Sequence, residues 1–239
     1  MYHPLMRRRV LILNMMVDRN MSDPVGQWSR FFRDVPVEAV HLPTGEAIPN
    51  VERFTHLLLS GSEASTQEPQ PWMHEAANCV RHAAELNLSI LGNCFGHQML
   101  VWSLSGAEFT RRAPRPEVGW IEVQIQGNDP LLAGVPQNWH AFAFHLDEVC
   151  DLPPPWKTLA ANPSCAHQAI RFGDRPIWGI QPHPEITPEE GMKLMRTAEP
   201  IVRESMPEYL PQLQEAIART PCDDFAAQQL VDNFLASRS

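Results

Sequence analysis

The stretch LSILGNCFGHQMLVWSLSG, residues 88–106, is the most informative part of the sequence for the fold. It begins with a short apolar run, residues 88–91, and then passes through Gly92-Asn93-Cys94-Phe95-Gly96. A helical pattern follows and ends at Ser105-Gly106, a common way to stop a helix. The order is therefore a buried strand, a sharp turn and a helix. Glycines on both sides of the turn would let the backbone bend without a clash from a Cβ atom.

The chain before this stretch repeats the same alternation. Apolar runs predict strands at 8–17, 35–42 and 55–59, the first of them buried on both faces. Ser22-Asp23-Pro24 predicts the start of one helix, and apolar residues at helical spacing predict a second helix over 71–87. Strands that alternate with helices indicate an α/β domain with a mainly parallel central sheet flanked by helices.

The chain after Gly106 changes character. Short β-like runs at 120–125, 139–144, 167–172 and 176–180 are separated by proline-rich loops such as 153–155, and they predict antiparallel additions to the sheet. Thr187 is expected to cap a further helix, and apolar residues after Pro207 predict two more, one with Leu210, Leu213 and Ile217 and one with Phe225, Leu230 and Phe234. We expect a main domain over 1–205 and a C-terminal helical extension over 206–239.

Composition narrows the class of protein. At 239 residues, with 44% hydrophobic and 20% charged content, the chain can bury a sizeable core. A net charge of -9 argues against binding to nucleic acid or to an anionic membrane surface, and it favours a small-molecule substrate. Arg7 to Arg9 precede an apolar run, as in a secretory signal. Because Asn14 interrupts that run, we interpret it as a buried first strand instead. No apolar stretch is long enough to span a bilayer, so we expect a cytoplasmic protein.

The five cysteines include no CxxC pair, so neither a disulfide framework nor a zinc site is indicated. Four of them are interpreted as buried structural thiols: Cys79, Cys150, Cys165 and Cys222. Cys94 differs because it lies at the turn between a strand and a helix. Such a turn exposes the sulfur, and the helix N-terminus stabilises a thiolate and supplies N–H groups to an oxyanion. Cys94 is thus the candidate nucleophile.

A thiol nucleophile needs a base, and ten histidines are available. His183 stands out because it follows an apolar strand and has a proline on each side, in Gln181-Pro182-His183-Pro184-Glu185. In extended backbone, residues i and i+2 point the same way. Glu185 is therefore placed to hold the imidazole of His183 in one tautomer and to stabilise its cationic form.

These two segments, GNCFGHQML (92–100) and IQPHPEI (180–186), resemble the motifs of the class I glutamine amidotransferase family. The resemblance runs from the first strand to about Met195. It implies a flavodoxin-like α/β fold and a catalytic triad of Cys94, His183 and Glu185. It also implies a γ-glutamyl thioester intermediate, with glutamine or another γ-glutamyl compound as the substrate. This chemistry requires no metal and no organic cofactor.

The resemblance extends to the groups around the nucleophile. It implies an oxyanion hole made by the backbone N–H groups of Phe95 and of the Gly61-Ser62 turn. This chain has Ser60-Gly61-Ser62-Glu63 where relatives usually carry two glycines and a proline. Gln98 corresponds to a residue that contacts the α-substituents of the glutamyl group; the alternative is that it only braces the turn.

Two further segments resemble the branch similar to the glutaminase part of GMP synthetase. PEVGW (116–120) matches its E-x-G-W stretch, and FHLDEV (144–149) matches its S-H-G-D-x-V stretch. The resemblance implies that Phe144 and His145 line the glutamyl pocket through backbone groups. Phe144 replaces a serine and Leu146 replaces a glycine, which predicts an altered pocket. A purely structural role for His145 is the alternative to substrate contact.

Three functions remain open on the sequence. The chain has neither a GxxxxGK[ST] nor a GxGxxG motif, so no nucleotide-binding loop accompanies the amidase. It could be a glutaminase subunit that delivers ammonia to a separate synthetase partner. It could be a free-standing γ-glutamyl hydrolase or peptidase. The third possibility is a domain that binds a ligand without catalysis. The altered Gly61-Ser62 and Phe144-His145-Leu146 positions leave it open, whereas the intact Cys94, His183 and Glu185 argue against it.

Overall fold

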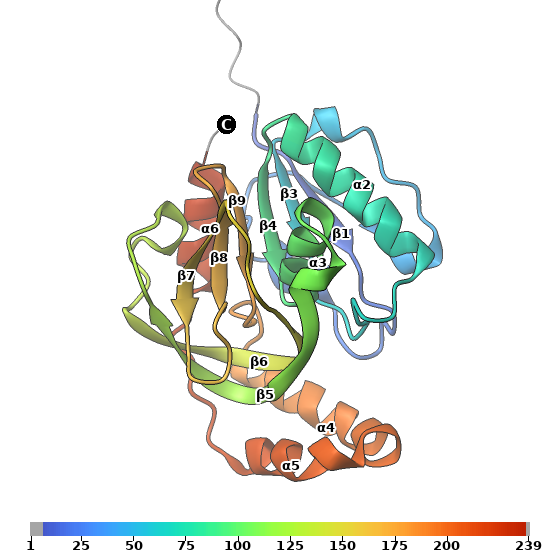
Figure 1. Ribbon diagram of the computed structural model, residues 1–239, viewed down its shortest axis with the longest axis vertical. Helices are drawn as coiled ribbons and strands as arrows, with labels where there is room; N and C mark the ends of the chain where they lie inside the picture. Colours follow the sequence, from blue (N-terminus) through green and yellow to red (C-terminus); the bar gives the residue numbers. More distant parts are fainter. Residues whose placement is uncertain (1–6, 238–239) are drawn as a thin grey trace, which may run out of the picture.

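A computed structural model describes residues 7–237. In this part of the chain nine strands form one curled sheet in the order β2-β1-β3-β4-β9-β8-β7-β5-β6 (Figure 1). Five neighbouring strands are parallel: β2 (Val37–His41), β1 (Val10–Asn14), β3 (His56–Leu59), β4 (Ser89–Asn93) and β9 (Ile177–Ile180). Antiparallel pairing adds four more: β8 (Ala169–Phe172), β7 (Trp156–Ala161), β5 (Thr110–Ile125) and β6 (Asn138–Val149). The predicted α/β class with antiparallel additions is confirmed.

Six α-helices accompany the sheet within residues 7–237: α1 (Pro24–Ser29), α2 (Pro71–Glu85), α3 (Phe95–Leu104), α4 (Pro188–Ser205), α5 (Leu210–Ala218) and α6 (Ala227–Ala236). Five short 3-10 turns lie at Leu42–Thr44, Val51–Arg53, Ala107–Phe109, Pro130–Leu132 and Pro207–Tyr209. The predicted caps are present: the Asp23 side chain accepts from the Gly26 N–H, and Thr187 forms a capping box with Glu190. None of the helices in residues 7–237 is both long and apolar enough to cross a membrane.

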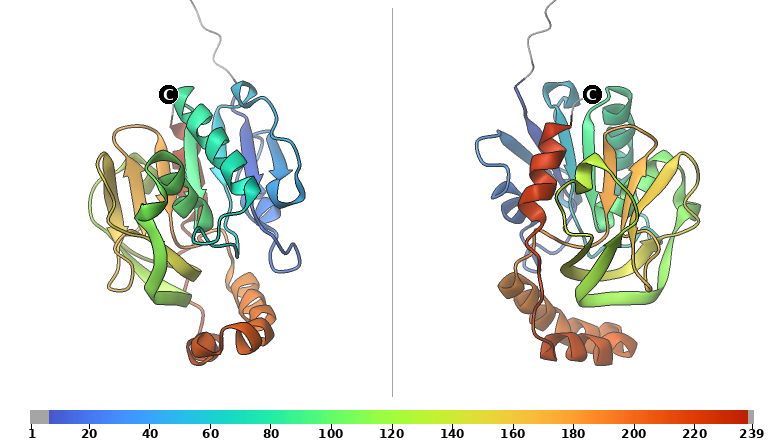
Figure 2. Two further views of the ribbon diagram at one scale, coloured as in Figure 1. Left: turned by 45° about the vertical axis from the view of Figure 1, so that its right-hand side comes forward. Right: turned by 90° about the vertical axis from the view of Figure 1, so that its left-hand side faces the viewer.

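The parallel half of the sheet is buried on both faces. Along β1, Leu11 and Leu13 belong to the apolar core on the side of α2 and α3. Val10 and Ile12 belong to the core on the other side, together with residues of α1 and α6. Figure 2 shows α2 and α6 on opposite sides of the sheet. This double burial explains why the strands here are nearly continuous apolar runs.

A third apolar cluster lies apart from these two. It joins α4 and α5 to β6 through Met195, Leu213 and Phe142, all fully or almost fully buried. Figure 1 shows the α4–α5 pair below the ends of β5 and β6, away from the main helices. The two helices that follow the His183 motif thus pack together beside the antiparallel end of the sheet.

The structure corrects several details of the predicted strands and helices. β7 was not predicted, because the prolines at 153–155 immediately before it favour a loop. β5 begins ten residues earlier than predicted, at Thr110 rather than 120; its internal prolines lie where the pairing with β6 shifts register, between Arg112 and Glu117. β9 pairs parallel with β4 and is not wholly an antiparallel addition. Phe225 is 70% exposed and precedes α6, so it is not part of an apolar helix face.

Candidate active site

Cys94 occupies the sharp turn between β4 and α3. Its φ of 49° and ψ of -108° are unusual for a residue with a side chain, and it is the N-cap of α3. The Cys94 N–H donates to the Ile180 carbonyl at 2.8 Å, so β9 holds the turn in place. The first N–H groups of α3 have no hydrogen-bond partners within the helix. They lie at its N-terminus, directly after Cys94.

Gly92 and Gly96 are required by the packing of this turn. A Cβ on Gly92 would lie 2.3 Å from the Gly96 carbonyl oxygen. A Cβ on Gly96 would lie 2.3 Å from the carbonyl oxygen of Leu59, in β3. Because both obstacles are backbone atoms, neither can move aside as a flexible side chain would. The glycines let α3 approach the sheet closely enough to present Cys94.

His183 and Glu185 form a buried pair opposite the turn. The imidazole Nδ1 lies 2.7 Å from the Glu185 Oε1, and the His183 N–H donates to the Phe142 carbonyl at 2.7 Å. The side chain of Asn93, next to the nucleophile, donates to the Pro182 carbonyl at 2.8 Å. The backbone carrying the histidine is therefore tied to both β4 and β6.

Arg30, from just after α1, braces the same segment from outside. Its guanidinium donates to the Glu185 carbonyl and contacts both carboxylate oxygens of Glu190 at 2.9 and 2.8 Å. Nothing in the sequence around Arg30 indicates this role. Asn93 could have been found, since it lies within the turn motif itself.

The electrostatics of the pair favour a protonated histidine. Burial of the imidazole by itself lowers the pKa of His183, but the charges of Glu185 and of Cys94, with hydrogen bonds to both, outweigh burial and raise this pKa from 6.5 to about 10. At neutral pH His183 is therefore an imidazolium. A cation at this position stabilises negative charge on the neighbouring sulfur.

The three predicted oxyanion residues, Gly61, Ser62 and Phe95, line one cavity with Cys94 and His183. Gly61 lies close to both side chains, because a Cβ there would be 2.8 Å from the His183 Cε1 and 3.6 Å from the Cys94 Cβ. The residues that depart from the family pattern hold the loop after β1. The Ser60 hydroxyl accepts from the Met15 N–H at 2.9 Å, and the Glu63 carboxylate accepts from the N–H groups of Val17, at 3.1 Å, and Asp18.

Gln98 and Phe144 also lie beside the nucleophile. The Gln98 amide donates to the Asp147 carbonyl at 2.9 Å and to the Gln181 side chain at 3.3 Å, so it braces the site while lining the cavity. The backbone carbonyl of Phe144 lies 4.0 Å from the Cys94 Sγ. Its side chain packs against the α4–α5 cluster.

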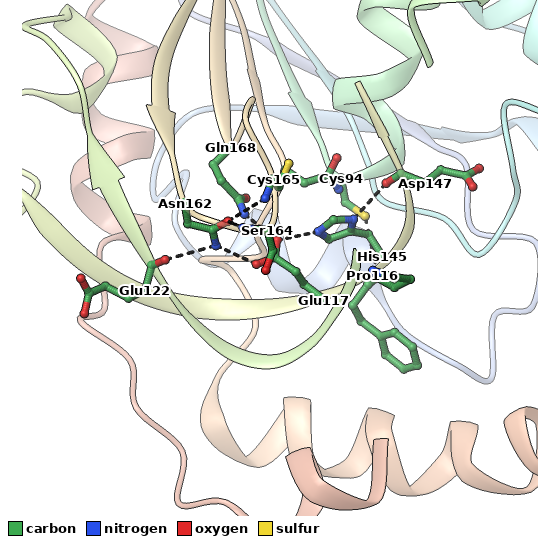
Figure 3. A network of polar contacts seen from close by, with 12 residues as sticks. Cys94, Pro116, Glu117, Glu122, His145, Asp147, Asn162, Ser164, Cys165 and Gln168 are labelled. Atoms are coloured by element: carbon green, nitrogen blue, oxygen red, sulfur yellow. Dashed lines mark hydrogen bonds and ion pairs between the residues drawn. The ribbon is translucent and has the colours of Figure 1, made fainter. Parts of the chain in front are cut away.

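His145 lies at the centre of a buried polar network, drawn in Figure 3. Its Nδ1 is 2.9 Å from the Asp147 carbonyl, and its Nε2 is 3.0 Å from a carboxylate oxygen of Glu117. The same carboxylate accepts from Asn162 and Gln168, each at 2.6 Å. Both ring nitrogens of His145 are thus occupied by the protein, which favours its structural role. In the sequence, Glu117 is visible only as part of the PEVGW motif.

Cys94 is only 3% exposed, contrary to the expectation that the turn exposes its sulfur, but it lines the cavity. The other cysteines have different surroundings. Burial raises the pKa of both Cys79 and Cys165 to about 12 and also raises the pKa of Cys150. All five thiols are free. Cys222 is exposed, contrary to the prediction that it is buried, because it lies in the linker between α5 and α6. Residues 7–237 contain no cluster of three or more His, Cys, Asp or Glu side chains that could hold a metal ion.

The cavity itself has a volume of about 240 Å³ and opens beside Cys94. Residues of α3, β5 and β6 contribute polar side chains to it: Gln98, Arg112 and Asp147. The Asp147 carboxylate pairs with Arg112 at 2.9 Å and accepts a hydrogen bond from the Ser65 hydroxyl. Apolar residues of α4 also line it. A candidate nucleophile, a histidine and a cavity for a small molecule therefore meet at one place.

Comparisons with known proteins agree on the family. The model of the family "Glutamine amidotransferase class-I" matches residues 30–198. The chain is 32% identical to a subunit of a glutamine-hydrolyzing GMP synthase from Pyrococcus furiosus, over 70% of this chain and 87% of the relative. A protein of the same name from Thermococcus kodakarensis is also 32% identical, over 67% and 83% of the two chains.

Solved structures share the fold. A glutamine amidotransferase from Thermotoga maritima superimposes with a TM-score of 0.73 at 18% identity, covering 97% of this chain and 99% of that one. A glutamine amido transferase from Methylobacillus flagellatus gives 0.71 at 20% identity, covering 98% and 97%. Taken with the family model, which spans well over half of the sequence, these likenesses establish that the chain belongs to the class I glutamine amidotransferase family of enzymes.

Proposed function

We propose that this protein hydrolyses the γ-amide bond of glutamine or of a related γ-glutamyl compound through a thioester on Cys94. The observation that carries the proposal is the strained turn at Cys94, with φ of 49°, which shares one cavity with the buried His183–Glu185 pair. A nucleophile, a histidine and an orienting carboxylate are the parts that such a reaction needs.

The first half of the reaction uses His183 as an acid. The thiol proton of Cys94 passes to His183, and the raised pKa of His183, about 10, holds that proton on the imidazole beside the sulfur. The sulfur attacks the γ-carbonyl carbon. N–H groups of Phe95 and of the Gly61-Ser62 turn stabilise the oxyanion. His183 donates its proton to the amide nitrogen, the C–N bond breaks, and ammonia or an amine leaves.

The second half uses the same residue as a base. His183, now neutral, takes a proton from a water molecule that attacks the thioester carbon. The C–S bond breaks, glutamate leaves, and the charged pair of Cys94 and His183 is restored. Glu185 keeps Nδ1 occupied throughout, so the reactive nitrogen is Nε2.

A second candidate function is an ammonia-donating subunit that works with a separate synthetase. It is favoured by the relatives, which are named as one subunit of a glutamine-hydrolyzing GMP synthase. A donor of that kind would be nearly inactive by itself, whereas a free-standing γ-glutamyl hydrolase would turn over without help.

Glutamate release by the purified chain tests the proposal, with glutamine and a γ-glutamyl dipeptide as substrates. We expect Cys94→Ser to lower the rate by about 10⁴-fold or more, because the alcohol is a far weaker nucleophile at neutral pH. Its thermal unfolding should match that of the wild type, since the change is nearly isosteric. Full activity of the variant would exclude Cys94 as the nucleophile.

A further inference from the structure

The α4 wall of the cavity is apolar and unusually extensive for a site whose simplest leaving group is ammonia. Leu194, Ala198, Ile201 and Val202 of α4 all line the cavity. Their spacing of three and four residues places them on one face of the helix. Met206 extends this face beyond the end of α4. We refer to these five residues as the α4 wall.

The α4 wall follows directly from the catalytic histidine along the chain. His183 leads to Glu185 and Ile186, both of which line the cavity, and α4 begins at Pro188. Because His183 donates the proton to the departing nitrogen, the group attached to that nitrogen leaves on the side of this segment. The substituent of the amide nitrogen is therefore directed toward the α4 wall.

The glutamyl part of the substrate has a different set of neighbours. Its α-amino and α-carboxylate groups are charged, and contact with an apolar wall without hydrogen bonds would be costly. Gln98, Arg112 and Asp147, contributed by α3, β5 and β6, are among the polar residues that line the cavity. The lining thus includes polar side chains suited to the amino acid and an apolar helix face suited to the leaving group.

The Phe144 side chain supports the same division. Its ring replaces the serine of the family pattern and packs against the α4–α5 cluster, as Leu194 and Met206 also do. Met21, from the loop before α1, contacts the same cluster and also lines the cavity. The departure at Phe144 and the α4 wall are therefore parts of one apolar surface. Ammonia is too small and too polar to make use of this surface.

The solvent exposure of residues in the α4 wall also supports an apolar leaving group. Ile201 is 45% exposed, although it is a large apolar residue at the cavity. Val202 beside it is only 3% exposed and fixes the helix against its cluster. An apolar substituent that entered the cavity would cover Ile201 and gain the free energy of removing both surfaces from water.

We infer that the preferred substrate is the γ-glutamyl amide of an apolar primary amine, whose alkyl or aryl group rests against the α4 wall. This inference rests on the proposed function and specifies its substrate. The chemistry is that of the two half-reactions above: the C–N bond breaks, the amine takes the proton of His183, and water releases glutamate. Both products are accounted for, and no oxidant or other reactant is required.

A series of γ-glutamyl amides tests the inference with the full chain. The methyl, butyl and hexyl amides are compared with glutamine and with the amide of β-alanine, which ends in a carboxylate. We expect kcat/KM to rise by about fourfold for each methylene that becomes buried. The β-alanine amide should be a worse substrate than the butyl amide, because its charge would face the α4 wall.

Ile201→Asp is the variant that isolates the α4 wall. The exposure of Ile201 makes the change compatible with folding. It should lower the ratio of kcat/KM for the hexyl amide to kcat/KM for glutamine by about tenfold or more. Leu86→Asp is the matched control, because Leu86 is a 36% exposed apolar residue at the end of α2 and outside the cavity. It should leave the whole series unchanged.

Binding of the same amides to Cys94→Ser, measured by calorimetry, separates two kinds of failure. Hydrolysis of glutamine with no preference along the series would overturn the inference and leave the proposed function standing. If the chain hydrolyses nothing, the proposed function fails, and binding decides: affinity that rises with alkyl length supports the apolar subsite. Affinity independent of length overturns it and leaves the wall available for a protein partner.

Discussion

The two halves of the sheet contribute to the site in different ways. The parallel half presents Cys94 by close contact of backbone with backbone: Gly96 of α3 approaches the Leu59 carbonyl so closely that no Cβ fits between them. The antiparallel half, with α4 and α5, contributes side chains such as Phe144 and Ile201, and one of these is half exposed. Under the proposed function, we expect bond-breaking chemistry to depend on backbone geometry that tolerates no change. We expect substrate choice to depend on side chains that can be replaced without moving Cys94.

The two histidines test this comparison most strongly. His183→Asn should lower glutamate release by about 10³-fold or more, because the site loses the group that donates and accepts the proton. His145→Asn should lower activity far less, since both ring nitrogens of His145 already contact the protein. Steady-state rates of the two variants, corrected for the folded fraction, provide the measurement. A larger loss of activity for His145→Asn than for His183→Asn would assign proton transfer to His145, in β6.

The glycine contacts offer a test of the rigid half. Gly96→Ala should reduce the free energy of unfolding by about 1–3 kcal/mol and lower activity as well, because α3 must move away from β3. Gly127→Ala is the matched control, since a Cβ at Gly127 has no neighbour within 4 Å. It should stay within about 0.5 kcal/mol of the wild type. Denaturant unfolding measures both, and equal stability of the two variants would contradict the close packing.

Stability at alkaline pH tests the charged pair. The pKa of His183 is about 10 in the folded protein and 6.5 for the ordinary side chain, so the folded state holds a proton that the unfolded chain releases. The resulting stabilisation is complete below pH 6.5, declines as pH rises, and is lost as pH passes through about 10. Relative to His183→Asn, the wild type should lose on the order of 1–3 kcal/mol between about pH 7 and pH 9. A constant difference between the two proteins over this range would contradict the raised pKa.

The smallest expected effect is a difference in alkylation rate between the cysteine thiols. Cys94 should react with iodoacetamide several-fold faster than Cys222 at neutral pH, because His183 stabilises negative charge on its sulfur whereas Cys222 is merely exposed. The other three should remain unlabelled in the folded protein, because burial raises their pKa and because they do not line the cavity, as the equally buried Cys94 does. Peptide mass mapping after a short exposure gives the order. Faster labelling of Cys222 would count against a charged pair.

The sequence predicted the parallel half of the molecule better than the antiparallel half. Buried parallel strands are continuous apolar runs, and the turn at Cys94 has its own glycine pattern, so both were visible. β7 and the first part of β5 were missed because prolines conceal strands from sequence patterns, even where a shift in register accommodates them.

The residues of the candidate site also differ in how well the sequence predicted them. Cys94, His183 and Glu185 lie in two short motifs, and their proximity follows from the neighbouring positions of β4 and β9. The roles of Arg30 and of the α4 wall depend on contacts between distant segments, which no local pattern encodes. The expected boundary between 1–205 and 206–239 stays a prediction. We note that α6, in the second part, packs into the core that contains β1.

Under the proposed function, the pairing of β4 with β9 also determines when Cys94 first becomes reactive. The Cys94 turn can form from adjacent residues, but His183 arrives only with β9, after the intervening antiparallel strands have been made and folded. Contacts between such distant segments form late, because long loops must close first. During synthesis and folding, the thiol therefore lacks the imidazolium that activates it. The reactive sulfur is created by the same step that completes the sheet, so an incompletely folded chain carries little of this reactivity.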